Sequence, residues 1–443
     1  MRMAARAQRR AFGGGLVLAL AVVSGLAQAA PAPARLTFAP SVRLTQPNLG
    51  GFEPSIVVDR YGNVYVTAHK QRQINVVAPD SLTGTGVRTA SFLWTSSDGR
   101  HFHDLTPDQS YVMNFGDEGE IALDGADHLY MVDTNVTDVT FARWHITGLG
   151  KQVLEDARPA IGTAQPVDDR PWVAANAAGD VLYIANAGAS PVNAASASAD
   201  GGGSGPGRFT AYVSHDRGHT FPTQGVTLKD SGWCYPAADP RPGSRTFYVA
   251  CIDNDVNTPD QAYDHAVRLF TTTNAGLSWS RQVIGHYQSA TWPSIKVASD
   301  GTVHVLVGDT LTTAKGTTGA LRLFSGRLGQ TMRERLLPTV GDHIPFAWLA
   351  VAPNGAVAAA YYAQRDAATP WYVHADVVGP TGTISTGQIG DVPLAPANGN
   401  PKGDFFEATF GPTNKLYVAY TALNQEPVSA AGLGTDVYVA HQR

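Results

Sequence analysis

Acidic and aromatic residues recur at the start of short apolar segments along this chain of 443 residues. Two carboxyl groups brought together can serve as general acid and general base, and aromatic faces suit sugar rings. As catalytic candidates we take Asp169, Arg170, Glu118, Asp404 and His343. As candidates for substrate binding we take Glu53, Asp117, Trp233, Tyr235, Trp292 and Asp342.

Each of these residues also has a structural interpretation. An aspartate at the start of an inner strand often only caps neighbouring backbone amides, and a repeated Gly-Asp pair fits that role. Asp168, Asp169 and Arg170 could form no more than a local ion pair. Trp172 and Trp348 fall inside apolar segments, which predicts core positions, whereas Trp233 and Trp292 could be either core or site.

One segment could bind a metal ion. Its oxygen-bearing side chains alternate, as in half of an EF-hand loop, and the weak calcium candidates are Asp253, Asp255 and Asn257. Thr258 replaces the glycine that such a loop requires, and no helix is predicted on either side. We therefore expect no required cofactor, with Ca²⁺ as the one ion that these residues could hold.

Cys234 and Cys251 are the only two cysteines of the chain. Cys234 precedes one apolar segment of a predicted hairpin and Cys251 ends the other. Antiparallel pairing brings such positions together, and an oxidising compartment would preserve the bond. The sequence therefore predicts a disulfide between them.

The elements that must position these side chains are seven copies of one pattern. Each copy has a short run rich in Val, Ile and Tyr, a turn with Asn, Asp or Gly, and a second such run, which together predict a tight hairpin. The copies lie at 53–66, 120–132, 170–184, 235–250, 292–306, 348–361 and 406–420. Most are followed by a third and a fourth strand-like run.

Seven four-stranded antiparallel units predict an all-β fold, a seven-bladed β-propeller, because one sheet alone cannot bury both of its faces. The last unit ends one strand short, and a strand-like run at 42–44 precedes the first. We expect this N-terminal strand to complete the last blade. Long segments at 70–90, 186–208, 253–267, 308–319 and 422–435 are expected as loops at the channel mouth.

The net charge and the N-terminal residues indicate which partners to exclude and where the protein is expected to work. The net charge is −5, which excludes a nucleic-acid interface built on a basic surface. Residues 1–29 have four arginines, an apolar run at 16–23 and an Ala-Gln-Ala cleavage site, which is typical of a signal peptide. Residues 9–10 also fit a twin-arginine signal, so Sec and Tat export both stay open. We expect cleavage, no membrane anchor, and a secreted or periplasmic monomer with one domain over 30–443.

Three predicted turns carry a further signature. Residues 214–221 (SHDRGHTF) match the Asp-box pattern, 272–279 (TTNAGLSW) match it with Asn for Asp, and 96–102 (SSDGRHF) are one residue short. In such a turn the Asp or Asn caps backbone amides, Gly takes a positive φ, and the aromatic residue packs beneath the hairpin.

With these turns the chain resembles the BNR/Asp-box, sialidase-like propeller superfamily, which includes exo-alpha-sialidases (neuraminidases). The resemblance implies a carbohydrate-related role and an alternative fold, the six-bladed sialidase propeller. Sialidases hold their substrate with three arginines and carry an Arg-Ile-Pro motif. Here the motif is absent, and Arg170 is the one arginine at the start of a copy.

Two functions follow as hypotheses. The first is a secreted glycan-processing enzyme, a glycoside hydrolase or polysaccharide lyase that uses carboxyl groups at the channel mouth. The second is a non-catalytic propeller that binds a glycan or a protein through the same face. The acidic set favours the first, and the lack of a complete catalytic constellation favours the second.

Overall fold

The computed structural model describes most of the chain beyond residue 33. The described residues are 34–45, 50–70, 91–105, 118–134, 139–161, 168–187, 209–229, 231–252, 265–290, 292–314, 316–341, 344, 346–403, 405–423 and 434–443. Ala34–Arg443 forms one compact unit. The predicted signal peptide lies outside the described residues.

The fold is all-β, with seven four-stranded antiparallel blades, as predicted. The first four blades are blade 1 with β3 (Gly51–Val58), β4 (Val64–Lys70), β5 (Phe92–Ser96) and β6 (His103–Asp104); blade 2 with β7 (Glu118–Leu123), β8 (His128–Thr134), β9 (Val139–Gly148) and β10 (Lys151–Ile161); blade 3 with β11 (Asp168–Ala175), β12 (Val181–Ala187), β13 (Phe209–Ser214) and β14 (Val226–Leu228); and blade 4 with β15 (Trp233–Ala238), β16 (Phe247–Ile252), β17 (Ala266–Thr272) and β18 (Ser280–His286).

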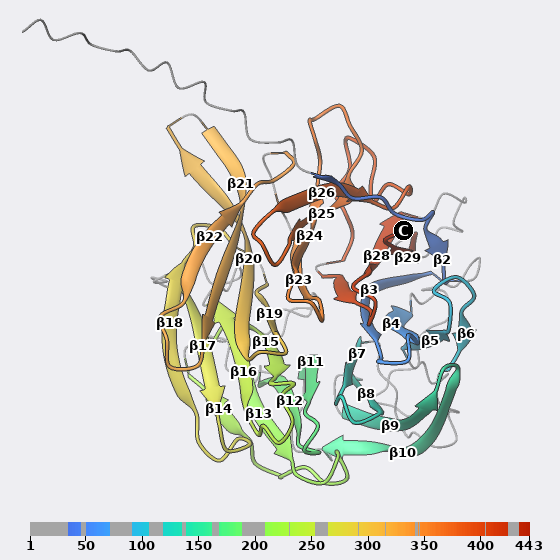
Figure 1. The fold of residues 1–443 in the computed structure, drawn as a ribbon, viewed down its shortest axis with the longest axis vertical. Helices are drawn as coiled ribbons and strands as arrows, with labels where there is room; N and C mark the ends of the chain where they lie inside the picture. Colours follow the sequence, from blue (N-terminus) through green and yellow to red (C-terminus); the bar gives the residue numbers. More distant parts are fainter. Residues whose placement is uncertain are drawn as a thin grey trace, which may run out of the picture. The chain divides into compact units, whose positions relative to one another are not determined.

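The remaining blades continue the same order along the chain. They are blade 5 with β19 (Ser294–Val297), β20 (Thr302–Thr313), β21 (Gly316–Arg327) and β22 (Arg333–Leu337); blade 6 with β23 (Ala347–Val351), β24 (Val357–Ala363), β25 (Tyr372–Val378) and β26 (Ile384–Ile389); and blade 7 with β27 (Glu407–Phe410), β28 (Leu416–Leu423) and β29 (Thr435–His441). The first strand of every blade contacts the first strand of the next, and β27 contacts β3, so these seven strands form a closed ring around a central channel (Figure 1).

The N-terminal segment closes this ring. Strand β2 (Val42–Arg43) pairs with β29, with Val42 opposite Val439, and so supplies the fourth strand of blade 7 (Figure 1). This confirms the predicted closure. Strand β1 (Ala34–Arg35) adds a contact that the sequence did not predict, because it pairs in parallel with β26 as a fifth strand of blade 6. The described N-terminal segment thus ties the last two blades together.

The turns have the geometry that their residues predict. In the turn between β3 and β4, Asp59 accepts hydrogen bonds from the backbone amides of Tyr61 and Asn63, both at 2.9 Å. In the turn between β13 and β14, Asp216 accepts from the Thr220 amide at 2.8 Å, and Gly218 has a φ of 75°. A Cβ at Gly218 would lie 1.9 Å from the ring of Phe141 in blade 2. Glycine is therefore required there both by φ and by space.

The hydrophobic core lies between neighbouring blades and continues into the middle of the ring. Trp144, Trp172 and Trp348 are among the largest fully buried side chains, which confirms the predicted core positions of Trp172 and Trp348. One expectation was wrong: residues 308–319 are not an open loop, because they extend β20 and β21 into a hairpin with twelve residues in each strand. Among the described residues, no helix is long and apolar enough to cross a membrane.

Candidate functional site

One position of the repeat lines the middle of the channel. In each blade, one residue begins the turn after the first strand, and its backbone amide donates a hydrogen bond to a carbonyl at the far side of that turn. These residues are Asp59, Asp124, Asn176, Asp239, Ala298, Ala352 and Gly411. The residues four places earlier are equivalent in all seven blades, and they are Ser55, Glu120, Trp172, Tyr235, Ser294, Trp348 and Glu407. Every one of them is buried. We call this set the channel layer.

Three members of the channel layer meet across the channel. The Tyr235 hydroxyl lies 2.5 Å from Oε1 of Glu407 and 3.1 Å from Oε1 of Glu120. The other oxygen of Glu407 accepts hydrogen bonds from the Ser55 hydroxyl at 2.6 Å and the Ile56 amide at 3.0 Å. This cluster therefore joins blades 1, 2, 4 and 7.

The proton count assigns different states to the two carboxyl groups. A phenol has one proton, so Tyr235 can donate to Glu407 or to Glu120, and the second contact needs a proton on a carboxyl group. Burial, and next the negative charge of Glu407, raise the pKa of Glu120 well above its ordinary value. Glu120 is thus the protonated partner and Glu407 the carboxylate. Burial also raises the pKa of Tyr235, which keeps its phenol neutral.

A lysine and several aromatic rings surround this cluster. Nζ of Lys296 lies 5.3 Å from the ring centroid of Tyr235, and its charge acts against the rise in the pKa of Glu120. The ring of Tyr235 meets Trp172 and Trp348 edge to face, each at 4.8 Å between centroids. Phe405 lies 5.0 Å from Trp172. These side chains fill the channel at this depth.

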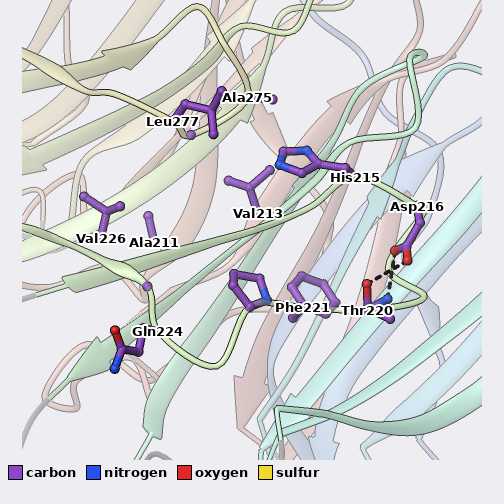
Figure 2. Close-up of a pocket in the computed structure, with 13 residues that line it drawn as sticks. Ala211, Val213, His215, Asp216, Thr220, Phe221, Gln224, Val226, Ala275 and Leu277 are labelled. Carbon is purple, nitrogen blue, oxygen red and sulfur yellow. Dashed lines mark hydrogen bonds between the residues drawn. The ribbon is translucent and has the colours of Figure 1, made fainter.

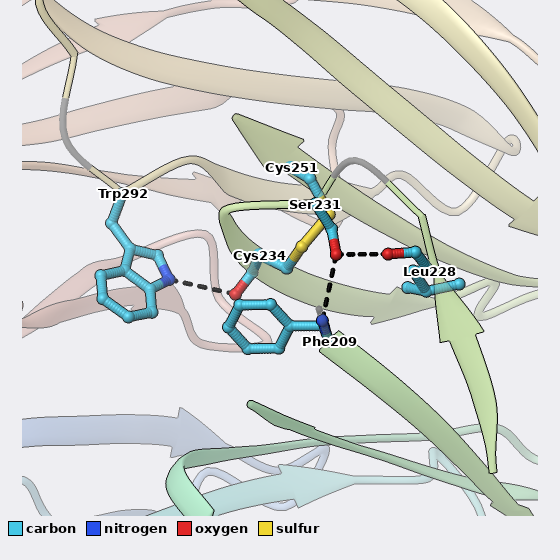
Figure 3. Close-up of a disulfide and its surroundings, with 6 residues drawn as sticks. All are labelled: Phe209, Leu228, Ser231, Cys234, Cys251 and Trp292. Carbon is cyan, nitrogen blue, oxygen red and sulfur yellow. Dashed lines mark hydrogen bonds between the residues drawn. A yellow bond between two sulfur atoms is a disulfide. The ribbon is translucent and has the colours of Figure 1, made fainter. Parts of the chain in front are cut away.

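The mouth is the end of the channel at which the first strands begin. There Trp233 is half-buried and packs edge to face on Trp292, with 4.3 Å between centroids. Trp292 is itself buried, and its Nε1 donates a hydrogen bond to the Cys234 carbonyl at 3.0 Å (Figure 3). Of these two rings, Trp233 is the one that solvent reaches.

Glu53 occupies a strained position at the start of blade 1. Its φ is 52°, and a register shift between Phe52 and Ser55 marks a bulge in β3. The Glu53 amide donates to the Thr421 hydroxyl at 2.9 Å, and Oε2 lies 3.6 Å from Nδ1 of His69. Phe52 packs against His69 with 4.6 Å between ring centroids. A carboxyl–imidazole pair therefore lies beneath the mouth, 2–5% exposed.

The remaining predicted site residues are placed only in part. Glu118 begins β7, and Asp168, Asp169 and Arg170 begin β11, so their backbones lie at the mouth. Asp117, Asp342, His343 and Asp404 lie outside the described residues, as do the calcium candidates Asp253, Asp255 and Asn257. The structure brings Trp233, Tyr235 and Trp292 into one aromatic cluster, in which Tyr235 lies deep in the channel layer.

The sequence interpretation missed Glu407 and Lys296, and it placed Glu120 among the acidic residues at the start of the copies without choosing it as a catalytic or binding candidate. The repeat pattern could have identified them, because all three lie on the first strand of a blade. Glu120 and Glu407 also share the position four residues before the turn. Among the described residues, no group of three or more His, Cys, Asp or Glu side chains is arranged so that it could hold a metal ion.

The predicted disulfide is present beside the channel layer. Cys234 and Cys251 are directly opposite in the β15–β16 pairing, with 4.2 Å between Cα atoms, and are joined by a disulfide (Figure 3). Both are fully buried. The bond fixes β15 against β16 one residue before Tyr235.

A separate hollow lies at the opposite end, where the strands turn. A cavity of about 470 Å³ opens between blades 3 and 4, with walls from Val213, Phe221, Val226 and Leu277 and with His215 at its rim (Figure 2). Leu277 is 78% exposed. None of the predicted site residues lines this cavity.

Comparison with known proteins finds similar structures but no similar sequence. No protein-family model and no curated protein sequence matches the chain. The polysaccharide lyase Uly1 is similar in structure, with a TM-score of 0.50 and 10% identity over 92% of this chain and 97% of its own. A protein of unknown function from Dyadobacter fermentans has a TM-score of 0.47 at 10% identity, covering 92% of this chain and 99% of its own. An alpha-L-arabinanase from Penicillium chrysogenum has a TM-score of 0.46 at 10% identity, covering 91% and 98%. At such low identity, the likeness of this chain to Uly1 is one of fold.

Proposed function

We propose that this protein binds or acts on glycans at the mouth of its central channel. The observation that supports the proposal is the convergence of aromatic rings and one carboxyl–imidazole pair from several blades at that end. The half-buried Trp233 rests on Trp292, and the Glu53–His69 pair and the buried Phe405 lie nearby on blades 1 and 7. Rings such as that of Trp233 offer faces to sugars.

The proposed class is a sialidase-like propeller of the BNR/Asp-box kind. Its support is the turn geometry at Asp98, Asp216 and Asn274, each of which accepts hydrogen bonds from backbone amides of its own turn. Lyase and glycoside hydrolase chemistry are both candidates that the resemblance to sialidase-like propellers implies; Uly1, which is similar in fold, is a polysaccharide lyase. Its likeness supports the fold, and the glycan proposal depends on the mouth residues.

A non-catalytic binding protein is the second candidate. It is favoured by the burial of the best-placed acid–base groups. Glu120, Tyr235 and Glu407 are 1–3% exposed and bonded to one another, so a substrate at the mouth would not touch them. Catalysis would then need other residues that the sequence proposes, such as Asp169 and Asp404.

A glycan panel with matched variants tests the site. Purified protein would be screened with polysaccharides and aryl glycosides for new reducing ends and for unsaturated products, and binding would be measured by calorimetry. Trp233→Ala should weaken glycan binding at least about tenfold, or 1.4 kcal/mol. Trp279→Ala, a half-buried tryptophan of the turn at the opposite end, should leave binding unchanged. Equal effects of both variants would refute a site at the mouth.

The panel also separates the two candidates. Turnover that is lost in Asp169→Asn or Asp404→Asn would establish an enzyme. Glycan binding without turnover on the whole panel would establish the binding protein.

We also propose that the protein works outside the cytoplasm, as a monomer without a membrane anchor. The Cys234–Cys251 disulfide supports this, because such bonds persist in oxidising compartments. N-terminal sequencing of protein from the culture medium or periplasm should find the chain starting at residue 30. An intact N-terminus on cell-associated protein would contradict it.

A further inference from the structure

Blade 4 presents a row of residues at the mouth that begins at Trp233 and runs outward. Strand register places Trp233 opposite Ile252, and Ile252 opposite Val267. Val267 in turn lies opposite Gly285 of the outer strand β18. The row crosses the blade at its mouth end, because β15 begins at Trp233. Neighbouring strands lie about 4.8 Å apart, so the row extends about 14 Å outward from Trp233.

Two exposed polar side chains lie just beyond the outer part of this row. His265 immediately precedes β17, and Gln288 follows the last residue of β18 by two places. The Tyr287 amide donates a hydrogen bond to the His265 carbonyl at 2.9 Å, and the two rings pack edge to face with 5.2 Å between centroids. The Tyr287 ring is buried. His265 and Gln288 are therefore neighbours that are joined through Tyr287.

The extended hairpin of blade 5 fixes the segment that carries Gln288. The buried carboxylate of Asp309 accepts hydrogen bonds from the amides of Gln288 and Ser289, at 3.0 and 2.7 Å. The Thr310 amide donates to the Ser289 carbonyl at 3.2 Å. The Thr312 amide donates to Oε1 of Gln288 at 2.7 Å. The side chain of Gln288 is thus oriented before any ligand binds.

The chain then leads from Gln288 back to the aromatic pair. It continues to Trp292, whose ring packs on that of Trp233 with 4.3 Å between centroids. Trp233, His265 and Gln288 therefore belong to one rim of the mouth, which we call the blade-4 ledge. The ledge offers an aromatic ring on its channel side. Further out it offers an imidazole and the two N–H donors of a glutamine amide.

We propose that the blade-4 ledge binds the further sugar units of a glycan whose first bound sugar rests on Trp233. This inference rests on the proposed function, and it names the ligand class as an oligosaccharide or polysaccharide rather than a single terminal sugar. A ledge of about 14 Å is longer than one sugar ring. Gln288 and His265 bind the hydroxyl groups that project from such a chain. Because the Thr312 amide already orients Gln288, little side-chain entropy is lost when the glycan binds.

The test measures affinity against chain length. Oligosaccharides from disaccharide to hexasaccharide, prepared from the panel polysaccharide that binds the protein, would be titrated by calorimetry. Affinity should rise along this series in the unchanged protein. Gln288→Ala should weaken hexasaccharide binding about fivefold, as expected for one hydrogen bond, and leave disaccharide binding unchanged. For a ligand that the protein cleaves, KM is compared in place of Kd.

Two further variants complete the set. His265 has a φ of 51°, which asparagine tolerates, so His265→Asn removes the ring without straining the backbone and should act like Gln288→Ala. Gln282→Ala is the matched control, because Gln282 is an exposed glutamine of β18 opposite Leu269 and further from the mouth. It should bind every chain length as the unchanged protein does. Both glutamine variants should unfold at the temperature of the unchanged protein, because their side chains are exposed.

The outcomes separate this inference from the proposed function. Equal affinity for all chain lengths, with binding still weakened in Trp233→Ala, overturns the ledge alone. Equal effects of Gln288→Ala and Gln282→Ala on hexasaccharide binding do the same. Undiminished binding in Trp233→Ala, or no binding of any glycan in the panel, overturns the mouth site and the ledge with it.

Discussion

The two buried glutamates of the channel layer should respond in opposite ways to the same substitution. Glu120 keeps its proton in the folded protein, because burial and the charge of Glu407 raise its pKa. Glutamine at position 120 reproduces that neutral group and can still donate to the Tyr235 oxygen. Glutamine at position 407 cannot accept the hydrogen bonds of Ser55, Ile56 and Tyr235 in the same way.

Above about pH 5, the two substitutions should change the free energy of unfolding in opposite directions. Below the ordinary pKa of 4.5, Glu120 is protonated in both the folded and the unfolded chain. Above it the unfolded chain loses the proton and the folded chain does not. The free energy of unfolding therefore falls by about 1.4 kcal/mol per pH unit, until the raised pKa is passed. Glu120→Gln removes this loss, whereas Glu407→Gln should lower the free energy of unfolding by about 3 kcal/mol at neutral pH.

The assay is urea unfolding of both variants and the unchanged protein at a series of pH values from about 4 to about 8. Glu120→Gln should be as stable as the unchanged protein at the acid end and more stable at the alkaline end. If Glu120→Gln and Glu407→Gln lose the same stability at about pH 8, Glu120 is charged in the fold and the assignment of the two carboxyl groups is wrong.

Three further changes test other parts of the fold. Burial raises the pKa of Asp376 to about 7, so the free energy of unfolding should fall by about 4 kcal/mol between about pH 4 and about 7. Asp376→Asn should remove this contribution, leaving that of Glu120, and be the more stable form at about pH 8; a slope equal to that of the unchanged protein would contradict the assignment. Gly218→Ala places a methyl group 1.9 Å from the Phe141 ring, at a φ of 75°. It should lower the free energy of unfolding, measured in urea, by at least about 3 kcal/mol. A change below about 1 kcal/mol would show that the ring can move away. Replacing Cys234 and Cys251 with alanine should remove about 3 kcal/mol, because the disulfide closes a short loop of sequence separation 17; an equal midpoint in oxidised and reduced protein would argue against it.

The fold could be predicted from the sequence because each blade repeats the same local rules. Turn residues such as Asp59 and Gly62 end one strand and begin the next, and seven such hairpins can bury their faces only against one another. Ring closure followed from the missing strand of the last unit. The contact of β1 with blade 6 was not predictable, because a two-residue strand carries no periodic signal.

The candidate site was harder to predict, because it depends on contacts across the ring. Tyr235 is 115 residues from Glu120 and 172 from Glu407. Their equivalent positions in the repeat indicate that they line the channel. Whether the side chains from blades 2, 4 and 7 contact one another depends on how far each extends across the channel, which the sequence does not show.

The filled channel constrains how the mouth can work. Trp172, Trp348, Tyr235 and Phe405 pack together at one depth, and the disulfide and the Glu120–Tyr235–Glu407 bonds fix the strands that carry them. A ligand at the mouth therefore meets a rigid floor built from several blades. Because this floor is rigid, the side chains of the mouth are already ordered before a ligand binds, and binding does not cost the entropy of ordering them. Such a preorganised site favours recognition of one ligand shape. Specificity would then come from the side chains that begin the first strands, since the layer beneath them is common to every ligand.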